Sequence, residues 1–332
     1  MSAKHADLLD DLLDGKHRAL ARVITKIENR DPGYRDLVSA LHGHTGSADV
    51  IGITGSPGAG KSTLVDKVAN YYRDRGETVG VIAIDPSSPF TGGAVLGDRI
   101  RMASNVGDMD VFFRSMSARG SLGGLSTATT DAVKALDAFG KDKIIVETVG
   151  AGQNEIDIVK TADTVAVLVP PESGDNVQML KAGILEIADV FVVNKADLPG
   201  ADRAVSDLKE MIHMRGHEPT PEFADDVEGY NWTPDVIETI AKEGDGVAEF
   251  VELLDEHHEL LEQTGMLEAK ARTRYAEEIR ALLREDANRL IAEEIEAQGG
   301  IAELVEAVHE RETDPYTVAA DVITPIENCL HD

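Results

Sequence analysis

The chain has 332 residues, 42% of them hydrophobic, which is enough for one large domain with helical additions. Its 61 acidic and 32 basic residues give a net charge of −29, which argues against nucleic-acid binding and fits either an ordinary acidic protein or adaptation to a salt-rich cytoplasm. No apolar run has membrane-spanning length, no signal peptide is evident, and the single cysteine, Cys329, excludes a disulfide framework, so we expect a cytoplasmic protein without membrane association.

The first segment of the chain has the pattern of a helical extension. Apolar residues recur at helical spacing over residues 5–42, and Asp31-Pro32-Gly33 interrupts them, which predicts two amphipathic helices. A polar linker follows at 42–47, and its H-x-H pair is more typical of solvated side chains than of a metal site. Residues 1–46 are therefore predicted to form an N-terminal helical segment.

Between residues 47 and 263, strand-like apolar runs alternate with amphipathic stretches. This alternation predicts an α/β domain, with a mostly parallel sheet flanked by helices on both faces. Ligands bind such sheets beyond the carboxyl ends of the strands, so each functional motif should follow a strand. The predicted strands are 50–54, 78–84, 110–114, 143–147, 164–169, 189–194 and 235–239, and the predicted helices are 61–75, 125–139, 153–161, 176–187, 202–215 and 247–262.

The first predicted strand runs into a glycine-rich loop. Residues 55–62, G-S-P-G-A-G-K-S, fit G-x-x-x-x-G-K-[ST] at every fixed position. The glycines let successive backbone N–H groups surround phosphate oxygens, and the helix that follows adds its positive dipole end. Lys61 is predicted to reach the β- and γ-phosphates as a catalytic cation, and Ser62 to ligate Mg²⁺. The predicted nucleotide-binding residues here are Gly55, Ser56, Gly58, Ala59, Gly60, Lys61, Ser62 and Thr63.

Two further predicted strands end in carboxylates. Asp85 follows the strand at 78–84, where it either faces Mg²⁺ or caps the next turn. Glu147 ends the strand at 143–147 and begins the pattern Glu-x-x-Gly. An acid at this place lies near Mg²⁺, and the N–H of Gly150 can contact the γ-phosphate. These two carboxylates therefore predict a Mg²⁺ site beyond the ends of the two strands.

A sequence N-K-A-D follows the sixth predicted strand and predicts guanine recognition. The Asp197 carboxylate can accept from N1–H and from the exocyclic amine, two donors that adenine does not present together. Asn194 would contact N7, and the stem of Lys195 would cover the base. The loop after the last strand, with Ile240 and Ala241, is predicted to lie under the guanine. These residues favour GTP and GDP over adenine nucleotides.

The C-terminal part of the chain is predicted to be helical, at 247–263, 267–298 and 300–312. The 267–298 stretch carries an apolar stripe that either packs on the chain's own domain or serves as a dimer arm. We expect residues 264–332 to form a helical arm that supports a homodimer.

Together these motifs resemble one family, the methylmalonyl-CoA mutase-associated GTPases, known as MeaB or ArgK-like proteins. The resemblance covers nearly the whole chain and depends on I-A-I-D-P-S-S-P, L-G-D-R-I-R-M, R-S-M-S-A-R-G-S-L-G-G-L-S and V-E-T-V-G-A-G-Q-N-E, beside the phosphate loop and N-K-A-D. It implies a P-loop NTPase fold and a GTPase chaperone of an adenosylcobalamin-dependent acyl-CoA mutase. Such a chaperone gates delivery of the cofactor, protects the enzyme and dimerises through its C-terminal helices.

The resemblance also implies further site residues. Asp98 would join Asp85 and Glu147 around the metal, and the turn from Gly150 to Gln153 would lie on the γ-phosphate side. A switch loop that ends near Lys181 would couple the mutase to the nucleotide. Catalytic roles would fall to Lys61, Glu147, Gln153 and Lys181.

Two other functions use related architectures. A nickel-inserting maturation GTPase needs Cys and His ligands near its switch loops, and the position of Cys329, close to the C-terminus, argues against it. A transport-linked ATPase or kinase would bind ATP, and N-K-A-D speaks against that.

Overall fold

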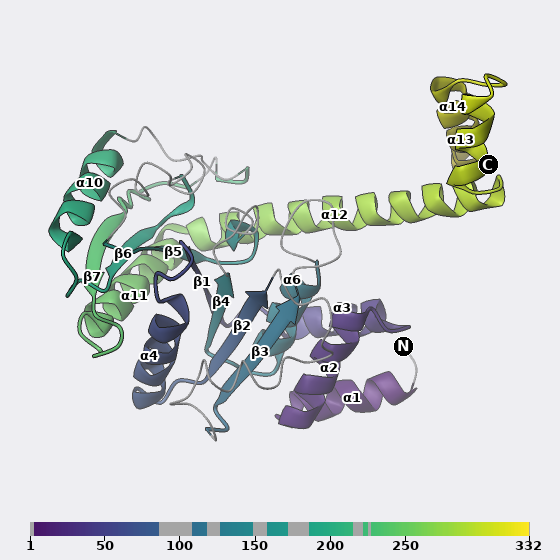
Figure 1. Ribbon diagram of the computed structural model, residues 1–332. Helices are drawn as coiled ribbons and strands as arrows, with labels where there is room; N and C mark the ends of the chain where they lie inside the picture. The colour runs from purple at the N-terminus through teal and green to yellow at the C-terminus, as the bar shows by residue number, and fades with distance from the viewer. Residues whose placement is uncertain are drawn as a thin grey trace. The chain divides into compact units, whose positions relative to one another are not determined.

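A seven-stranded parallel sheet forms the core of the unit Met1–Thr273 in the computed structural model (Figure 1). The structure describes residues 3–85, 108–117, 127–148, 158–171, 186–214, 222–224 and 227–331. The strand order is β3-β2-β4-β1-β5-β6-β7, and every pairing between these strands is parallel. All seven predicted strands are confirmed: β1 Asp49–Gly55, β2 Val79–Asp85, β3 Val111–Ser117, β4 Lys143–Thr148, β5 Thr164–Val169, β6 Val190–Asn194 and β7 Asp235–Thr239.

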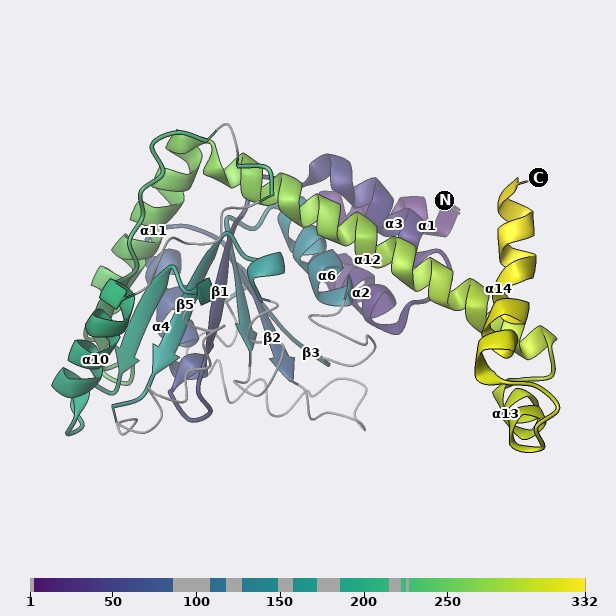
Figure 2. The ribbon, with the colours of Figure 1, turned by 90° about the horizontal axis from the view of Figure 1, so that it is seen from above.

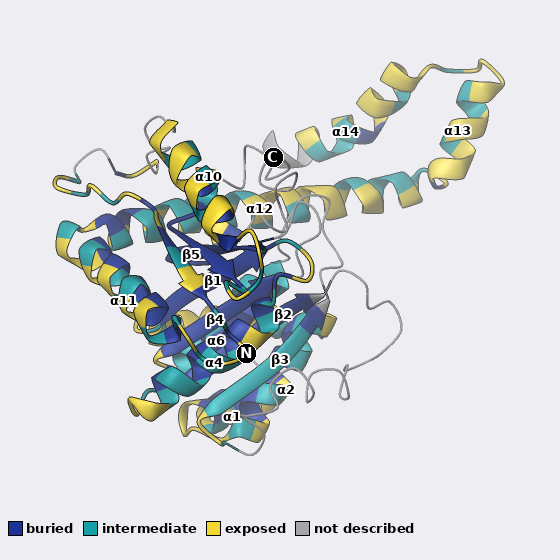
Figure 3. Ribbon diagram, turned by 60° about the vertical axis from the view of Figure 1, so that its left-hand side comes forward, coloured by how far each residue is buried: buried dark blue, intermediate teal, exposed yellow. Residues whose placement is uncertain are grey.

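The central strands are buried on both faces, with apolar residues in their middle and polar residues mostly at their ends. Every residue of β1, β4, β5 and β6 is buried, and Figure 3 shows these strands in dark blue. The carboxyl ends of the strands point to one edge of the sheet, as the arrowheads in Figure 2 show. Motifs that follow different strands therefore meet at this edge.

Two hydrophobic clusters cover the two faces of the sheet. One face packs against α4 (Lys61–Asp74) and α11 (Val247–Thr264). The other packs against α6 (Thr127–Ala138), α10 (Ala201–Met214) and the N-terminal helices. The fold is thus the helix–sheet–helix sandwich of a P-loop NTPase, as predicted.

The N-terminal segment contains three helices where two were predicted: α1 (Ala3–Leu13), α2 (His17–Asn29) and α3 (Tyr34–Leu41). Gly15 divides the first predicted helix. Its φ of 77° lies in the left-handed region, and its N–H donates to the carbonyl of Leu12 at 2.9 Å, which ends the helix. A short 3₁₀ turn, η1 (His42–His44), follows α3. These helices belong to the cluster that covers the α6 face of the sheet.

The C-terminal part is helical, with α12 (Met266–Ala297), α13 (Ile301–His309) and α14 (Pro315–His331). The sequence predicts a helical C-terminal region, but no separate helix at α14. The chain divides into two compact units, Met1–Thr273 and Arg274–Asp332. Apolar side chains in the second unit are exposed, among them Ile279 (58%) and Leu283 (64%).

Two predicted helices cannot be compared fully with the structure. The helices expected at 153–161 and 176–187 fall mostly outside the described residues, although Ile158–Lys160 form a short 3₁₀ helix, η3. Among the described residues, no helix combines the length and the apolar character needed to cross a bilayer.

Candidate functional site

The candidate site lies at the carboxyl edge of the sheet, where β1 runs through the glycine-rich loop into α4. Three glycines of this loop have positive φ: Gly55 (132°), Gly58 (76°) and Gly60 (92°). At Gly55 a side chain is sterically excluded, because a Cβ would lie 2.1 Å from the carbonyl oxygen of Leu168. Ser56 N–H donates to that same oxygen at 3.3 Å, so β5 fixes the start of the loop. The loop backbone thus has the curled form that suits a phosphate cradle.

Lys61 and Thr63 occupy different environments in the first turn of α4. Lys61 is only 6% exposed, and its ammonium donates to the carbonyl oxygens of Gly55 at 2.7 Å and Ser56 at 3.0 Å. These bonds hold the cation against the loop, where phosphate oxygens could replace the carbonyl oxygens as acceptors. Thr63 is exposed.

Ser62 and Glu147 bring the end of β4 to the loop. The Ser62 hydroxyl donates to Oε1 of Glu147 at 2.5 Å, and Glu147 is 5% exposed. A hydroxyl and a carboxylate are oxygen ligands of the kind that Mg²⁺ prefers, so this donor set fits the predicted metal. Asp85 ends β2 at the same edge, but its side chain lies outside the described residues. Asp98, Gly150, Gln153 and Lys181 also lie outside the described residues.

Asn194, at the end of β6, connects three parts of the site. Its Nδ2 donates to the carbonyl of Ala59 in the loop at 2.7 Å. Its Oδ1 accepts from the Thr239 hydroxyl at 3.0 Å and from the N–H of Ala241 at 3.1 Å. The sequence predicted Asn194 only as a contact of the base. In the structure its hydrogen bonds also connect the phosphate loop to the end of β7.

The residues after Asn194 leave the sheet at its carboxyl edge. Lys195 has a φ of 64°, a left-handed backbone that lysine rarely adopts, and the Asp197 side chain is exposed. Ala241 is 2% exposed, and Ile240 bridges to Asp245 across the loop that leads into α11. Asn194, Asp197 and the 240–241 segment therefore lie at the same edge of the sheet as the phosphate loop, as the motif order predicts.

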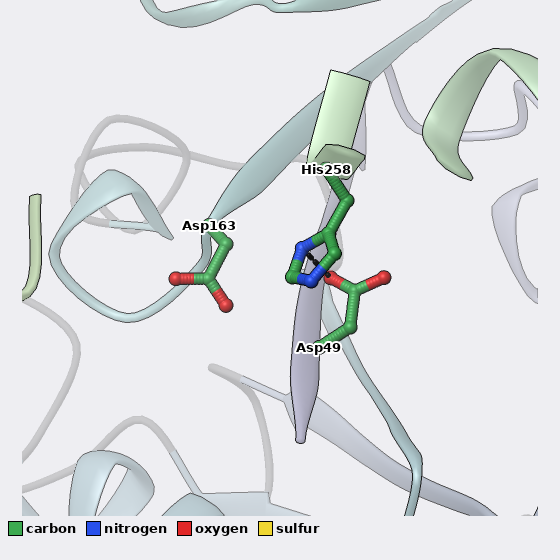
Figure 4. A group of neighbouring side chains, drawn as sticks. All are labelled: Asp49, Asp163 and His258. Atoms are coloured by element: carbon green, nitrogen blue, oxygen red, sulfur yellow. Dashed lines mark ion pairs between the residues drawn. The ribbon is translucent and has the colours of Figure 1, made fainter. Parts of the chain in front are cut away.

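A second polar cluster lies at the amino edge of the sheet and was missed in the sequence, because its members are far apart in the chain (Figure 4). Nδ1 of His258, on α11, lies 3.2 Å from Oδ1 of Asp49. The other Asp49 oxygen, Oδ2, accepts from the Lys143 ammonium at 3.0 Å. Asp163 completes the group, and its Oδ2 accepts from the N–H of Val50 at 3.0 Å.

The charges of this second cluster indicate an ion-pair network. The Asp49 carboxylate beside the ring raises the pKa of His258 above its usual value. Lys143 supplies a second cation beside the same carboxylate. Asp49 thus faces both Lys143 and His258, and these side chains connect α11 to the amino ends of β1 and β4.

Comparison with known proteins places the chain in a family. The family profile described as methylmalonyl-CoA mutase-associated GTPase MeaB matches residues 20–296. A protein of Pyrococcus abyssi named as a GTPase is 47% identical over 320 residues, covering 96% of this chain and 95% of that protein. The mouse protein named methylmalonic aciduria type A homolog, mitochondrial, is 30% identical over 285 residues, covering 81% of this chain and 66% of that protein.

A solved structure agrees with the fold. The crystal structure of an LAO/AO transport system kinase superposes with a TM-score of 0.71 at 24% identity, covering 98% of this chain and 99% of that one. At this identity the likeness concerns the fold alone. The family match over residues 20–296 spans the phosphate loop, the end of β4 and the N-K-A-D segment, and this chain therefore belongs to the MeaB family of methylmalonyl-CoA mutase-associated GTPases.

Proposed function

We propose that this protein binds GTP and GDP with Mg²⁺, hydrolyses GTP, and uses the nucleotide to control its association with an adenosylcobalamin-dependent acyl-CoA mutase. The observation that carries the proposal is the contact between Ser62 and Glu147, which unites a loop hydroxyl with a strand-end carboxylate at 2.5 Å. This pair joins the phosphate loop to the end of β4, and the turn that follows β4 is proposed to contact the γ-phosphate.

The phosphate loop supplies the binding groups for the nucleotide. Backbone N–H groups of residues 55–63 would surround the phosphates, and Lys61 would exchange the carbonyls of Gly55 and Ser56 for the β- and γ-phosphate oxygens. This exchange costs little positional freedom, because the ammonium is already held at the loop. Lys61 then neutralises charge that develops on the transferred phosphoryl group.

Ser62 and Glu147 would hold Mg²⁺ together with Asp85 and Asp98. Bound there, the ion would neutralise the phosphate oxygens and orient them for attack by water. Glu147 is buried, so water screens its charge poorly, and the carboxylate would attract a Mg²⁺ ion bound beside Ser62 strongly. Gly150, Gln153 and Lys181 are proposed on the γ-phosphate side, with Gln153 and Lys181 as the catalytic partners of Lys61 and Glu147.

The base would be read by Asp197, whose two carboxylate oxygens can accept from both guanine donors. The Lys195 stem would cover one face of the ring, and the backbone at Ile240 and Ala241 would lie beneath it. Asn194 holds this segment to the phosphate loop, which supports a fixed distance between base and phosphates.

The mutase association is supported by the family description and by the name of the mouse relative. If GTP and GDP favour different loop conformations, a partner that contacts those loops is linked thermodynamically to the nucleotide. Such a link would make GTP hydrolysis a timing signal for cofactor delivery and enzyme protection. We further propose a homodimer through residues 264–332, where apolar side chains such as Ile279 and Leu283 are exposed.

The proposal is tested by titrating a purified adenosylcobalamin-dependent acyl-CoA mutase with this protein. Three states are compared: a non-hydrolysable GTP analogue, GDP and no nucleotide, with ADP and a Lys61→Ala variant as controls. We expect mutase affinity to differ between the GTP-analogue and GDP states by about fivefold or more, with no effect of ADP. A mutase that binds in none of these states and leaves GTP turnover unchanged contradicts the chaperone function.

A further inference from the structure

A buried pair of hydroxyl groups joins β1 to β4 beside the candidate site. Oγ1 of Thr54 lies 2.7 Å from Oγ1 of Thr148, and the two residues are 0% and 1% exposed. The β1–β4 register runs to Ile53 opposite Glu147, so the threonine pair lies one residue beyond the last of these partners. The two hydroxyls thus extend the link between the strands to their carboxyl ends.

This pair and the Ser62–Glu147 contact lie on opposite faces of the sheet. Glu147 is paired with Ile53, whose side chain belongs to the cluster on the α4 face, and α4 carries Ser62. Successive side chains on a strand alternate between the faces, so Thr54 and Thr148 face the α6 side. Glu147 and Thr148, which are consecutive in β4, therefore contact the two ends of the loop from opposite faces of the sheet.

The same two contacts bracket the phosphate loop in the sequence. Thr54 immediately precedes Gly55, the first residue of the loop, and Ser62 is its last residue. Thr148 contacts Thr54 at the start of the loop, and Glu147 accepts a hydrogen bond from Ser62 at its end. Both contacts thus set the position of the Glu147 carboxylate relative to the loop. The threonine pair does not involve Ser62, so it can persist when Ser62 exchanges Glu147 for another partner.

We propose that Thr148, through Thr54, is a positioning residue that holds Glu147 in register with the phosphate loop. This inference builds on the proposed GTPase function. If Mg²⁺ takes over the Ser62–Glu147 contact, the threonine pair is the link between β1 and β4 at the loop that does not change. Loss of the Thr148 hydroxyl should then affect metal-dependent turnover far more than nucleotide binding, because misplacement of a catalytic group lowers the rate without removing the binding groups.

The test measures three quantities on the full chain: kcat for Mg²⁺-dependent GTP hydrolysis, the Mg²⁺ concentration for half-maximal rate, and the Kd of GDP in EDTA. For Thr148→Val we expect kcat to fall about tenfold or more and the Mg²⁺ requirement to rise. We expect the GDP Kd in EDTA to stay within about twofold. Thr148→Ser keeps the hydroxyl and should restore most of the rate.

A double variant separates positioning from a loss of stability. Thr148→Val leaves the buried Thr54 hydroxyl without this partner, whereas Thr54→Val with Thr148→Val removes both polar groups and should recover stability. We expect kcat to stay low in the double variant, since no hydroxyl pair is restored. Recovery of kcat together with the melting temperature would assign the pair a purely structural role and overturn the proposal.

Thr164→Val is the matched control. Thr164 is also a buried strand threonine, 1% exposed, but its hydroxyl lies 2.8 Å from Nδ1 of His257 at the other edge of the sheet. It should destabilise the protein without changing kcat. If Thr148→Val and Thr164→Val have the same kcat for GTP hydrolysis, the positioning role is wrong, whereas the proposed GTPase function is unaffected. Wild-type protein that hydrolyses no GTP contradicts the proposed function itself, and the positioning role with it.

Discussion

Asn194 donates from its Nδ2 to the backbone carbonyl of Ala59 at 2.7 Å, and this bond fixes the end of β6 to the phosphate loop. Both groups are buried, so the amide would lose a hydrogen bond without gaining water if the loop moved away. The contact also explains why residue 60 is glycine. A Cβ at Gly60 would lie 2.4 Å from the Asn194 Nδ2, closer than real Cβ contacts allow.

Alanine at Gly60 and at Gly58 should therefore have unequal effects. Both glycines have positive φ, so each Gly→Ala change costs about 1 kcal/mol of backbone strain. A Cβ at Gly58 meets nothing within 4 Å, whereas at Gly60 it also displaces Asn194. We expect Gly60→Ala to lower the free energy of unfolding clearly more than Gly58→Ala, measured by urea denaturation without nucleotide. Equal losses would show that the Asn194 contact is dispensable to the loop.

Glu147→Gln tests the metal site. The amide keeps the shape of Glu147 and can still accept from Ser62, but it removes the negative charge that faces Mg²⁺. Mg²⁺-dependent GTP hydrolysis should fall by about a hundredfold, while the Kd of GDP in EDTA changes little. Calorimetry and phosphate release measure the two quantities. An equal loss of both would mean that Glu147 only supports the loop.

Lys195 has a left-handed backbone, with φ of 64°, two residues before Asp197, the carboxylate proposed to read the base. Asparagine tolerates this conformation better than lysine, so Lys195→Asn should raise the free energy of unfolding without nucleotide by about 0.5–1 kcal/mol. It should also weaken GDP binding, because no stem then covers the base. Arg311 has a φ of 65° in the C-terminal unit, is exposed and provides the control. Arg311→Asn should stabilise the protein similarly and leave GDP affinity unchanged.

His257 should make the protein sensitive to acid. Its ring is fully buried, with Nδ1 2.8 Å from the Thr164 hydroxyl and Nε2 3.1 Å from the Tyr230 hydroxyl, and burial lowers its pKa to about 4. The unfolded chain binds this proton near pH 6.5, so the stability is fully present above that pH and is lost as the pH falls toward 4.

The expected loss attributable to His257 is about 2 kcal/mol between pH 7 and pH 5. Urea denaturation of wild type and His257→Gln at the two pH values isolates it, since all other titrating groups are common to both proteins. Trp232, the only tryptophan in the chain, has its ring centroid 4.7 Å from that of His257 and reports unfolding by fluorescence. Identical pH dependence in the two proteins would contradict the assignment.

The fold could be predicted from the sequence because its signals are local. The central strands are continuous apolar runs, and the glycine loop and N-K-A-D follow two of them directly. Gly15 was overlooked because the leucine pattern continues across it. Long-range side-chain pairs left no local signal: Thr54 and Thr148 are 94 residues apart, and Asn194 lies 135 residues from Ala59. Only the assembled sheet brings such partners together.

Guanine recognition by Asp197 is the central claim about this site, and Asp197→Asn tests it most directly. The amide cannot accept from both guanine donors, and its NH₂ group can donate to the C2 carbonyl that xanthine carries in place of the amine. We expect calorimetry to show GDP affinity reduced by about 2–4 kcal/mol, tens- to hundreds-fold, and xanthosine diphosphate affinity increased, while ADP binds neither protein tightly. If Asp197→Asn binds GDP as well as wild type does, the assignment of this segment to the guanine base is wrong.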